Sequence, residues 1–281
     1  MAALTLRSTV KLSSGFQLPV LGLGVYKSVG DEVVTACLAA LKNGYRHIDT
    51  ATAYKNEQEV SEAIRRSDVS RSDIFITSKI NSPYQGFAET LTAVETSLGK
   101  LGTDYIDLYL VHDPVSGRQM RLDTYRALIK KRDEGKLRSI GVSNFNVRHL
   151  EEIIEAGLEL PTVNQLEVHP FCQQREIILW CTARGIVIEA YCPVMRMAAG
   201  MIDHPVLVNI AQKLYRQPTQ VAIRWGIQKG YVLLPKSTRE QRIIENADVF
   251  SFSIPDDEVA VLNELDRGAQ GAISWNPVNS D

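Results

Sequence analysis

The chain has 281 residues and a formal net charge of −2, with 44% hydrophobic and 23% charged residues. These values are ordinary for a globular protein and exclude a disordered, collagen-like or coiled-coil chain. The balanced charge gives no general attraction to polyanions, and no run of Lys and Arg exceeds three residues. Neither a nucleic acid nor a membrane surface is therefore an expected partner.

The cysteines and the apolar runs bear on the cellular compartment. Cys37, Cys172, Cys181 and Cys192 form no CxxC pair and no disulfide framework of the kind found in small secreted domains. The amino terminus lacks the apolar stretch of a signal peptide, and no run approaches the roughly 18 apolar residues that span a bilayer. The sequence therefore predicts a cytoplasmic protein.

Strand and helix patterns alternate along the whole chain. A β-hairpin with a Ser-Ser-Gly turn is predicted at residues 9–20. Short apolar or β-branched runs predict eight strands, at 20–26, 46–50, 74–80, 106–112, 139–144, 162–169, 187–193 and 232–237. Helical patterns separate the strands, for example at 31–44, 87–102 and 146–157, with two stretches divided at Pro218 and a last helix near 256–266. This alternation predicts parallel strands joined by helical crossovers.

Eight strands that are each followed by helical sequence predict an α/β fold, a (β/α)8 TIM barrel with an N-terminal β-hairpin and extra C-terminal helices. No linker interrupts the pattern, so residues 1–281 are expected to form a single barrel domain. A doubly wound sheet is the alternative fold. It would need a dinucleotide fingerprint after the first strand, and the GxG at residues 22–24 lacks both the third glycine and the following helix.

Polar residues end the predicted strands one after another. They are Asp49, Lys79, His112, Ser143 with Asn144, Gln165, Tyr191, and Lys236 with Ser237. Any one of them alone is more simply explained as a helix cap or a solvated turn. In a parallel barrel, however, the carboxyl ends of the strands meet at one rim, where reactive side chains gather. The joint occurrence of these residues therefore predicts a site at that rim.

Three of these residues, Asp49, Lys79 and His112, can combine with Tyr54 into an acid catalyst. Tyr54 follows the second strand, and a free tyrosine has a pKa of about 10, so its proton leaves reluctantly unless the phenolate is stabilised. The ammonium of Lys79 would provide that stabilisation, with Asp49 as its counter-ion. His112 could hold a substrate oxygen by a second hydrogen bond. A proton donor beside an oxygen that develops negative charge is what carbonyl reduction requires.

Several sequence blocks together resemble the aldo-keto reductase family, from about Leu4 to the C-terminal tail. They are GYRHIDTATAY at 44–54 followed by Asn56 and Glu57, ITSKI at 76–80, DLYLVHDP at 107–114, GVSNF at 141–145, NQLEVHP at 164–170 and LPKSTREQRIIEN at 234–246. Members of this family are (β/α)8 barrels that bind NADPH without a Rossmann fold and reduce aldehydes or ketones. The resemblance thus implies NADPH as the cofactor and a small carbonyl compound as the substrate.

The resemblance also implies a role for each candidate residue. Tyr54 is implied as the acid, Lys79 and Asp49 as the pair that tunes it, and His112 as the group that orients the carbonyl. The implied contacts of the nicotinamide are Ser143, Asn144 and Gln165 on the carboxamide and Tyr191 against the ring. Those of the adenosine end are Lys236, Ser237, Arg242, Glu245 and Asn246. A lysine with an arginine six residues on, at the start of a helix, suits a 2′-phosphate.

The chain departs from the family pattern at the expected substrate pocket. Tyr26 stands where many members have tryptophan, and Asp113 follows the candidate histidine where an aromatic residue is common. Trp275 in the tail is a further candidate pocket residue. The segment 192–200 also differs from the usual block that packs on the pyrophosphate, and its Arg196 is either a pyrophosphate contact or a solvated loop residue.

Two other functions are alternatives. A metal-dependent barrel hydrolase would need clustered imidazoles and carboxylates, whereas the rim histidines are few and scattered, so no metal is expected. The fold also resembles the cytosolic β-subunits of potassium channels, which bind nicotinamide cofactor as partner proteins. All four candidate catalytic residues are present, which favours the enzyme. A monomer is expected, with a dimer as the alternative.

Overall fold

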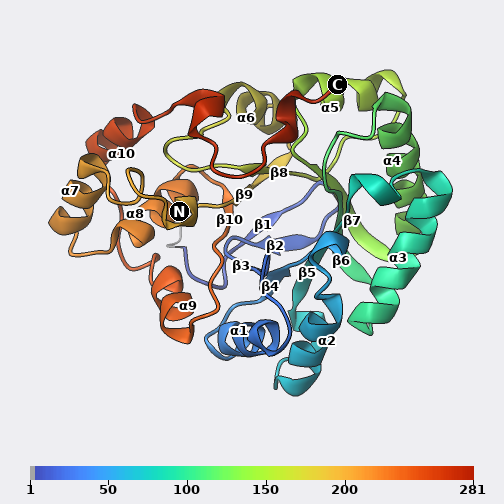
Figure 1. The fold of residues 1–281 in the computed structure, drawn as a ribbon, viewed down its shortest axis with the longest axis horizontal. Helices are drawn as coiled ribbons and strands as arrows, with labels where there is room; N and C mark the ends of the chain where they lie inside the picture. Colours follow the sequence, from blue (N-terminus) through green and yellow to red (C-terminus); the bar gives the residue numbers. More distant parts are fainter. Residues whose placement is uncertain (1–3) are drawn as a thin grey trace.

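The computed structural model describes residues 4–281, in which eight parallel strands form a barrel surrounded by helices (Figure 1). The strands are β3 (Leu23–Gly24), β4 (His47–Asp49), β5 (Phe75–Ile80), β6 (Ile106–Val111), β7 (Leu137–Ser143), β8 (Val163–Glu167), β9 (Val187–Tyr191) and β10 (Val232–Leu234). Each strand pairs with the next one in the sequence. Parallel bridges from Leu21 to Leu233 and from Gly24 to Lys236 join the first strand to the last. The predicted (β/α)8 barrel is confirmed.

The predicted N-terminal hairpin is also present. Strands β1 (Thr9–Lys11) and β2 (Gln17–Pro19) pair antiparallel around the Ser-Ser-Gly turn. Leu12 and Leu18 of the hairpin are buried in a small apolar cluster, separate from the main core, that includes Phe75, Leu108 and Val163. Because these partners come from β5, β6 and β8, the hairpin covers the inside of the barrel at one end.

Ten α-helices, besides short 3-10 turns, occur within residues 4–281. They are α1 (Asp31–Lys42), α2 (Glu57–Arg66), α3 (Phe87–Leu101), α4 (Arg118–Asp133), α5 (Val147–Glu155), α6 (Arg175–Thr182), α7 (Pro205–Lys213), α8 (Pro218–Gln228), α9 (Glu240–Ala247) and α10 (Asp256–Asn263). Pro205 and Pro218 occupy first helical positions, where proline costs no hydrogen bond. No helix in this part of the chain combines the length and apolar character that crossing a bilayer requires.

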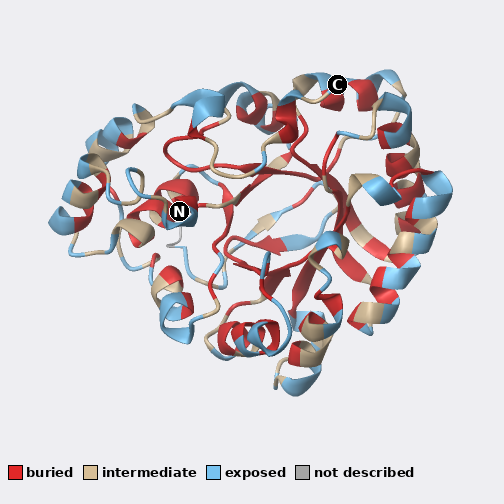
Figure 2. Cartoon of the chain, viewed as in Figure 1, coloured by how far each residue is buried: buried red, intermediate tan, exposed pale blue. Residues whose placement is uncertain are grey.

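Burial follows the barrel architecture. The strands are buried along nearly their whole length, and the helices turn their exposed faces outward (Figure 2). All six residues of β5 and all six of β6 are buried. Strands of a parallel sheet that are covered on both sides have continuous apolar runs instead of alternation. Polar residues within these strands therefore have to find partners inside the barrel.

The first barrel strand is shorter than predicted. Residues 20–26 were expected to be extended, but only Leu23 and Gly24 form β3. The nearby Gly22 has a packing reason, because a Cβ atom there would lie 2.6 Å from Nδ1 of His47. Gly22 of the rejected GxG pattern therefore serves the close packing of the barrel interior.

We predict that Gly22→Ala destabilises the fold. The added methyl group overlaps the buried His47 ring, and overpacking of this kind costs about 1 to 3 kcal/mol. Urea unfolding of both proteins measures the difference. The matched control is Gly99→Ala in α3, where no heavy atom lies within 4 Å of the new Cβ and better helix propensity should add about 0.5 to 1 kcal/mol. Equal stability of Gly22→Ala and the wild type would contradict the packing argument.

Candidate active site

A cavity of about 630 Å³ opens at the carboxyl ends of the barrel strands. Its lining includes the ends of β4, β7, β8 and β9 and the loops that follow the strands. Of the predicted site residues, the cavity brings together Tyr26, Asp49, Tyr54, His112, Asp113, Ser143, Asn144, Gln165, Tyr191, Lys236 and Trp275. The rim predicted from the sequence is thus one continuous concave surface.

Asp49, Lys79 and Tyr54 form a connected group at the base of this cavity. The Nζ atom of Lys79 donates hydrogen bonds to Oδ1 of Asp49 at 2.7 Å and to the carbonyl oxygen of Thr50 at 2.9 Å. Its third contact is Oη of Tyr54 at 3.3 Å. Lys79 is completely buried. A buried ammonium needs a counter-ion, so the Asp49 contact holds the charge in place beside the phenol.

Burial dominates the electrostatics of Tyr54. It raises the pKa of the phenol well above 10, and the carboxylate of Asp49 adds to the rise. From the sequence, Lys79 was expected to make the Tyr54 phenol easier to ionise. In the structure, Asp49 balances the charge of Lys79, and burial makes the phenol harder to ionise. Tyr54 therefore holds its proton at neutral pH, and Lys79 remains close enough to stabilise a phenolate once the proton has left.

His112 lies beside Tyr54 in the cavity lining. The two rings make an edge contact, with centroids 5.6 Å apart. Burial, with the nearby charge of Lys79, lowers the pKa of His112 to about 3. The imidazole is therefore neutral at physiological pH. Its Nδ1 atom is buried without a hydrogen-bond partner in the described chain, which leaves Nε2 as the nitrogen that can meet a ligand.

Ser143, Asn144 and Tyr191 form a second polar group on the adjacent wall. Asn144 has a left-handed backbone, with φ 63°, directly after β7. Its Nδ2 atom donates to Oγ of Ser143 at 3.0 Å and to the carbonyl oxygen of His112 at 3.1 Å. Its Oδ1 atom accepts from Oη of Tyr191 at 2.8 Å. This network fixes the Tyr191 ring at the end of β9, next to the amide group.

Gln165 lies between two carboxyl groups, one of which the sequence analysis missed. Its Nε2 atom donates to Oδ2 of Asp49 at 2.8 Å and to Oε2 of Glu189 at 2.5 Å. Glu189 is completely buried in β9. Burial raises the pKa of Glu189 to about 8, and the nearby Asp49 contributes to the rise. The sequence carried one signal for this residue, a glutamate inside the apolar run VIEAY. Its contact with Gln165 inside the barrel explains why it is there.

The expected adenosine-end residues lie around the start of α9. Lys236 and Arg242 are exposed, and the sequence analysis missed a third exposed cation, Arg239, which directly precedes the helix. None of these three side chains makes an ion pair within residues 4–281. Ser237 accepts a hydrogen bond from the backbone of Arg239 at 3.1 Å.

The other two residues of this group lie further along α9. Glu245 accepts from the side chain of Gln241 at 3.0 Å, and Asn246 is buried. Of the five residues expected at the adenosine end, only Lys236 lines the cavity itself.

Two aromatic residues, Tyr26 and Trp275, and one acidic residue, Asp113, line the outer part of the cavity. The ring of Tyr26 lies 4.9 Å from that of Tyr54, centroid to centroid, and is 42% exposed. Trp275 also lines the cavity and is 62% exposed. Asp113 is buried and accepts from the backbone N–H groups of Ser82 at 3.2 Å and Val115 at 3.3 Å. Its carboxylate therefore joins two rim loops.

The tail is attached to the rim by Glu167, a residue that was not singled out from the sequence. Its carboxylate accepts from the backbone N–H groups of Ile273 at 2.7 Å and Ser274 at 3.1 Å. Nε2 of His169 donates to the same group at 3.0 Å. Burial opposes ionisation, but these hydrogen bonds outweigh it and hold the pKa of Glu167 below its usual value. The contact places Trp275 beside the cavity.

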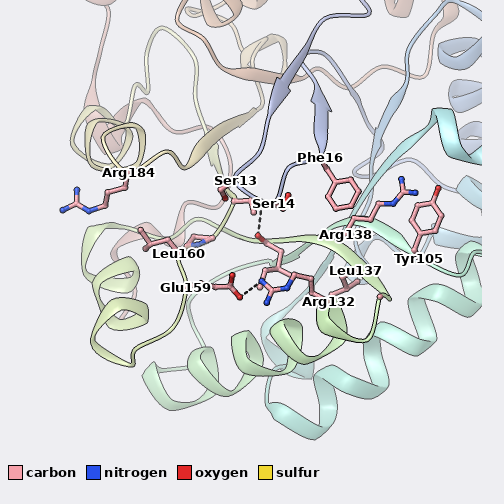
Figure 3. A pocket seen from close by; sticks show the side chains of 14 residues that line it. Ser13, Ser14, Phe16, Tyr105, Arg132, Leu137, Arg138, Glu159, Leu160 and Arg184 are labelled. Carbon is pink, nitrogen blue, oxygen red and sulfur yellow. Dashed lines mark hydrogen bonds and ion pairs between the residues drawn. The ribbon is translucent and has the colours of Figure 1, made fainter.

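Another cavity, of about 890 Å³, lies at the amino ends of β6, β7 and β8 (Figure 3). Two of its three arginines make ion pairs, and the guanidinium of Arg184 lies 3.9 Å from the centre of the Trp180 ring. Arg132 pairs with Glu159, and Arg138 pairs with Asp107 at 2.9 Å while its guanidinium lies 3.7 Å from the centre of the Tyr105 ring. No cluster of three or more potential metal-ligating side chains occurs anywhere in residues 4–281. The chemistry-bearing groups gather at the opposite, carboxyl end of the strands.

The chain belongs to the aldo/keto reductase family, whose sequence model matches residues 21–267. It is an oxidoreductase that acts on carbonyl compounds, as the family assignment and the reductase relatives show. It is 46% identical to the glyoxal reductase of Bacillus subtilis over 94% of each chain. It is 40% identical to the methylglyoxal reductase DkgA of Escherichia coli, over 93% of this chain and 94% of the relative.

Solved structures agree with this assignment. An aldo-keto reductase from a deep-sea metagenome library superposes with a TM-score of 0.92 at 39% identity, over 97% of this chain and 99% of that chain. A Bombyx mori aldo-keto reductase in complex with NADP superposes with a TM-score of 0.89 at 33% identity, over 99% of this chain and 100% of that chain.

We predict that replacing Glu189 changes the pH dependence of stability. The folded chain favours the neutral carboxyl up to about pH 8, whereas an unfolded glutamate ionises near 4.3. The contribution of Glu189 to the stability of the fold is therefore complete below the pKa of this group in the unfolded chain. It is lost as pH rises through the pKa of Glu189 in the folded chain. Between pH 5 and pH 8, Glu189→Gln should gain stability relative to the wild type, by up to about 1.4 kcal/mol per pH unit.

Urea unfolding at several pH values in this window measures the effect. The exposed carboxyl of Glu176, at the start of α6, provides the control variant Glu176→Gln, which should follow the wild type. Parallel pH profiles for Glu189→Gln and the wild type would show that Glu189 ionises alike in the folded and unfolded chains.

Proposed function

We propose that this protein reduces an aldehyde or ketone to the alcohol, with NADPH as hydride donor and Tyr54 as proton donor. The observation that carries this proposal is the buried Asp49–Lys79 pair, whose ammonium lies 3.3 Å from Oη of Tyr54 at the base of the rim cavity. The names of the glyoxal and methylglyoxal reductases support a small carbonyl substrate. The relative that was solved in complex with NADP supports the cofactor.

Tyr54 supplies the proton. As the carbonyl carbon is reduced, its oxygen gains negative charge, and the O–H bond of Tyr54 breaks while a new O–H bond forms on the substrate. The phenolate that remains is stabilised by the ammonium of Lys79 and regains a proton from solvent. The raised pKa of Tyr54 keeps the phenol protonated before the reaction, which is the form that an acid catalyst needs.

His112 orients the substrate. Because its imidazole is neutral, it can donate one hydrogen bond from Nε2 without adding a charge to the cavity. Together with Tyr54, it would hold the carbonyl oxygen from two directions. Two donors aimed at an oxygen that becomes negative lower the barrier more than they stabilise the ground state.

The residues of the cavity wall fit the nicotinamide end of NADPH, which supplies the hydride when bound. A carboxamide has both a donor and an acceptor, and the side chains of Ser143, Asn144 and Gln165 offer both kinds of group. Nε2 of Gln165 is already used inward by Asp49 and Glu189, so its Oε1 atom is the group left for the carboxamide N–H. Tyr191, held by Asn144, would cover one face of the ring.

The start of α9 fits the adenosine end. Lys236, Arg239 and Arg242 carry positive charges with no carboxylate partner in the described chain, as a receptor for a 2′-phosphate requires. We assign Ser237, Glu245 and Asn246 to the same end, with Ser237 near the phosphate and the other two toward the adenine. A helix N-terminus in this position adds to the attraction for an anion.

The activity is tested by multiple-turnover oxidation of NADPH with a panel of simple aldehydes, α-dicarbonyls and ketones. Turnover that exceeds the enzyme concentration many times supports the proposal. Tight NADPH binding with a single turnover or none would instead fit a cofactor-binding partner protein such as a channel subunit.

We predict that Tyr54→Phe lowers the rate of carbonyl reduction by about 10² to 10⁴, the usual value of general acid catalysis. NADPH affinity should stay within about threefold, because the hydroxyl and not the ring is removed. Steady-state kinetics and a fluorescence titration measure the two quantities. Tyr215→Phe, at a 95% exposed position, is the matched control. Turnover of Tyr54→Phe near the wild-type rate would remove Tyr54 from the mechanism.

We predict that Arg242→Ala weakens NADPH binding about tenfold while NADH binding changes little. The two cofactors differ only in the 2′-phosphate, and a hydrogen bond to a charged group contributes about 1.5 to 3 kcal/mol, reduced here because the side chain is exposed. Added salt should erode the preference. Arg65→Ala on α2 is the control for loss of an exposed arginine. Equal losses for both cofactors would show that Arg242 does not bind the phosphate.

A further inference from the structure

Glu189 occupies a position inside the barrel that the proposed reaction does not use. Its side chain is completely buried and does not line the cavity, so it would meet neither substrate nor cofactor. Its partners in register on the neighbouring strands are Gln165 and Val232, which do not ionise. The titratable groups that face it come from two other strands: Asp49 and His47 of β4 and Lys79 of β5.

One ammonium serves two carboxyl groups in this interior. The Nε2 group of Gln165 donates to Asp49 at 2.8 Å and to Glu189 at 2.5 Å. The ammonium of Lys79 contacts Asp49 at 2.7 Å, whereas Glu189 makes no ion pair with a lysine or arginine within residues 4–281. If both carboxyls were ionised, two anions would share one cation away from water, which is costly. Glu189 is therefore the carboxyl that stays protonated at neutral pH, in line with a pKa that burial raises to about 8.

His47 does not supply the second positive charge. Its Nε2 atom lies 3.5 Å from Oε1 of Glu189 and 2.9 Å from Oγ1 of Thr77. Burial, with the nearby charge of Lys79, lowers the pKa of His47 to about 3, so the imidazole is neutral at physiological pH. Ionisation of Glu189 therefore adds an uncompensated negative charge to the barrel interior.

This added charge acts on Tyr54. Burial raises the pKa of the Tyr54 phenol, and the negative charges of Asp49 and Glu189 add to the rise. An ionised Glu189 thus opposes the phenolate that forms as Tyr54 gives up its proton, although it touches none of the reacting atoms. A protonated Glu189 keeps the hydrogen bond to Gln165 without this opposition.

We propose that Glu189 is a positioning residue for the proton transfer from Tyr54, which fixes the amide of Gln165 while it is uncharged and slows carbonyl reduction when it ionises. This inference rests on the proposed reductase function and adds a control on the rate of its proton transfer. The bonds that break and form are those proposed above. The proton that leaves Glu189 exchanges with solvent and takes no part in the reaction.

The pH profile of kcat for reduction of a simple aldehyde by NADPH tests the inference. Each protein is measured from pH 6 to pH 10 and scaled to its own rate at pH 6. The wild-type rate should fall through a midpoint near pH 8 to a plateau about tenfold lower, as expected when a second buried anion opposes formation of the phenolate. Loss of the proton from Tyr54 itself would instead carry the rate toward zero.

Three variants identify the group that ionises. Glu189→Gln carries no charge at any pH, and its amide oxygen can accept the same bond from Gln165, so its profile should lack the fall. Glu189→Asp keeps a carboxyl group and should keep a fall. Glu57→Gln is the matched control, because Glu57 is also buried but accepts from Oγ of Ser78 at 2.7 Å and does not line the cavity. Its profile should match that of the wild type. A fall that Glu189→Gln shares with the wild type would overturn the inference.

An infrared titration follows Glu189 without any turnover. The C=O stretch of the protonated carboxyl group that is absent in Glu189→Gln should disappear from the wild type with a midpoint near pH 8. Asp49→Asn should move this midpoint to lower pH, because the charge of Asp49 adds to the rise in the Glu189 pKa. A band that persists to pH 10, or that is missing already at pH 6, overturns the inference even if reductase activity is found. If the band titrates as expected but no protein reduces an aldehyde at any pH, the proposed function fails, and the coupling of Glu189 to Asp49 stands.

Discussion

The structure of the rim depends on one buried ion pair, Lys79 with Asp49. The ammonium is completely buried, so it can remain charged only with a carboxylate in contact, and the 2.7 Å separation provides this. The pair also adds to the effect of burial on its neighbours. Burial, reinforced by Asp49, raises the pKa of Tyr54 and Glu189, and burial with the charge of Lys79 lowers the pKa of His112. The phenol, the carboxyl and the imidazole are therefore all neutral at physiological pH.

Neutral side chains around a single ion pair suit the proposed carbonyl reduction. In the proposed reaction one proton leaves Tyr54, and the ammonium of Lys79 is already in position beside it, so little reorganisation accompanies the step. The side-chain amide of Gln165 bonds Asp49 and Glu189, and its backbone oxygen accepts from the N–H group of Asn144 at 2.8 Å. The proposed acid catalyst and the proposed nicotinamide contacts are thus parts of one hydrogen-bonded network at the rim.

The two ends of the barrel have different roles. At the amino end, the hairpin fills the barrel and the arginines of the larger cavity are paired or stacked (Figure 3). At the carboxyl end, the tail is fastened by Glu167, and several cations have no carboxylate partner in the described chain. Size therefore does not identify the site, whereas uncompensated charge beside buried titratable groups does.

The barrel, its hairpin and the rim positions of Asp49, Tyr54, His112 and Tyr191 were predictable from the sequence, because strand periodicity and strand ends are local properties of the chain. The partners of these residues were not. Glu189 contacts Gln165, and Arg196 lies over Tyr26, only because strands and loops distant in sequence meet in the closed barrel. The direction of the Tyr54 pKa shift was likewise decided by the tertiary structure, since burial outweighs a neighbouring charge that is itself paired.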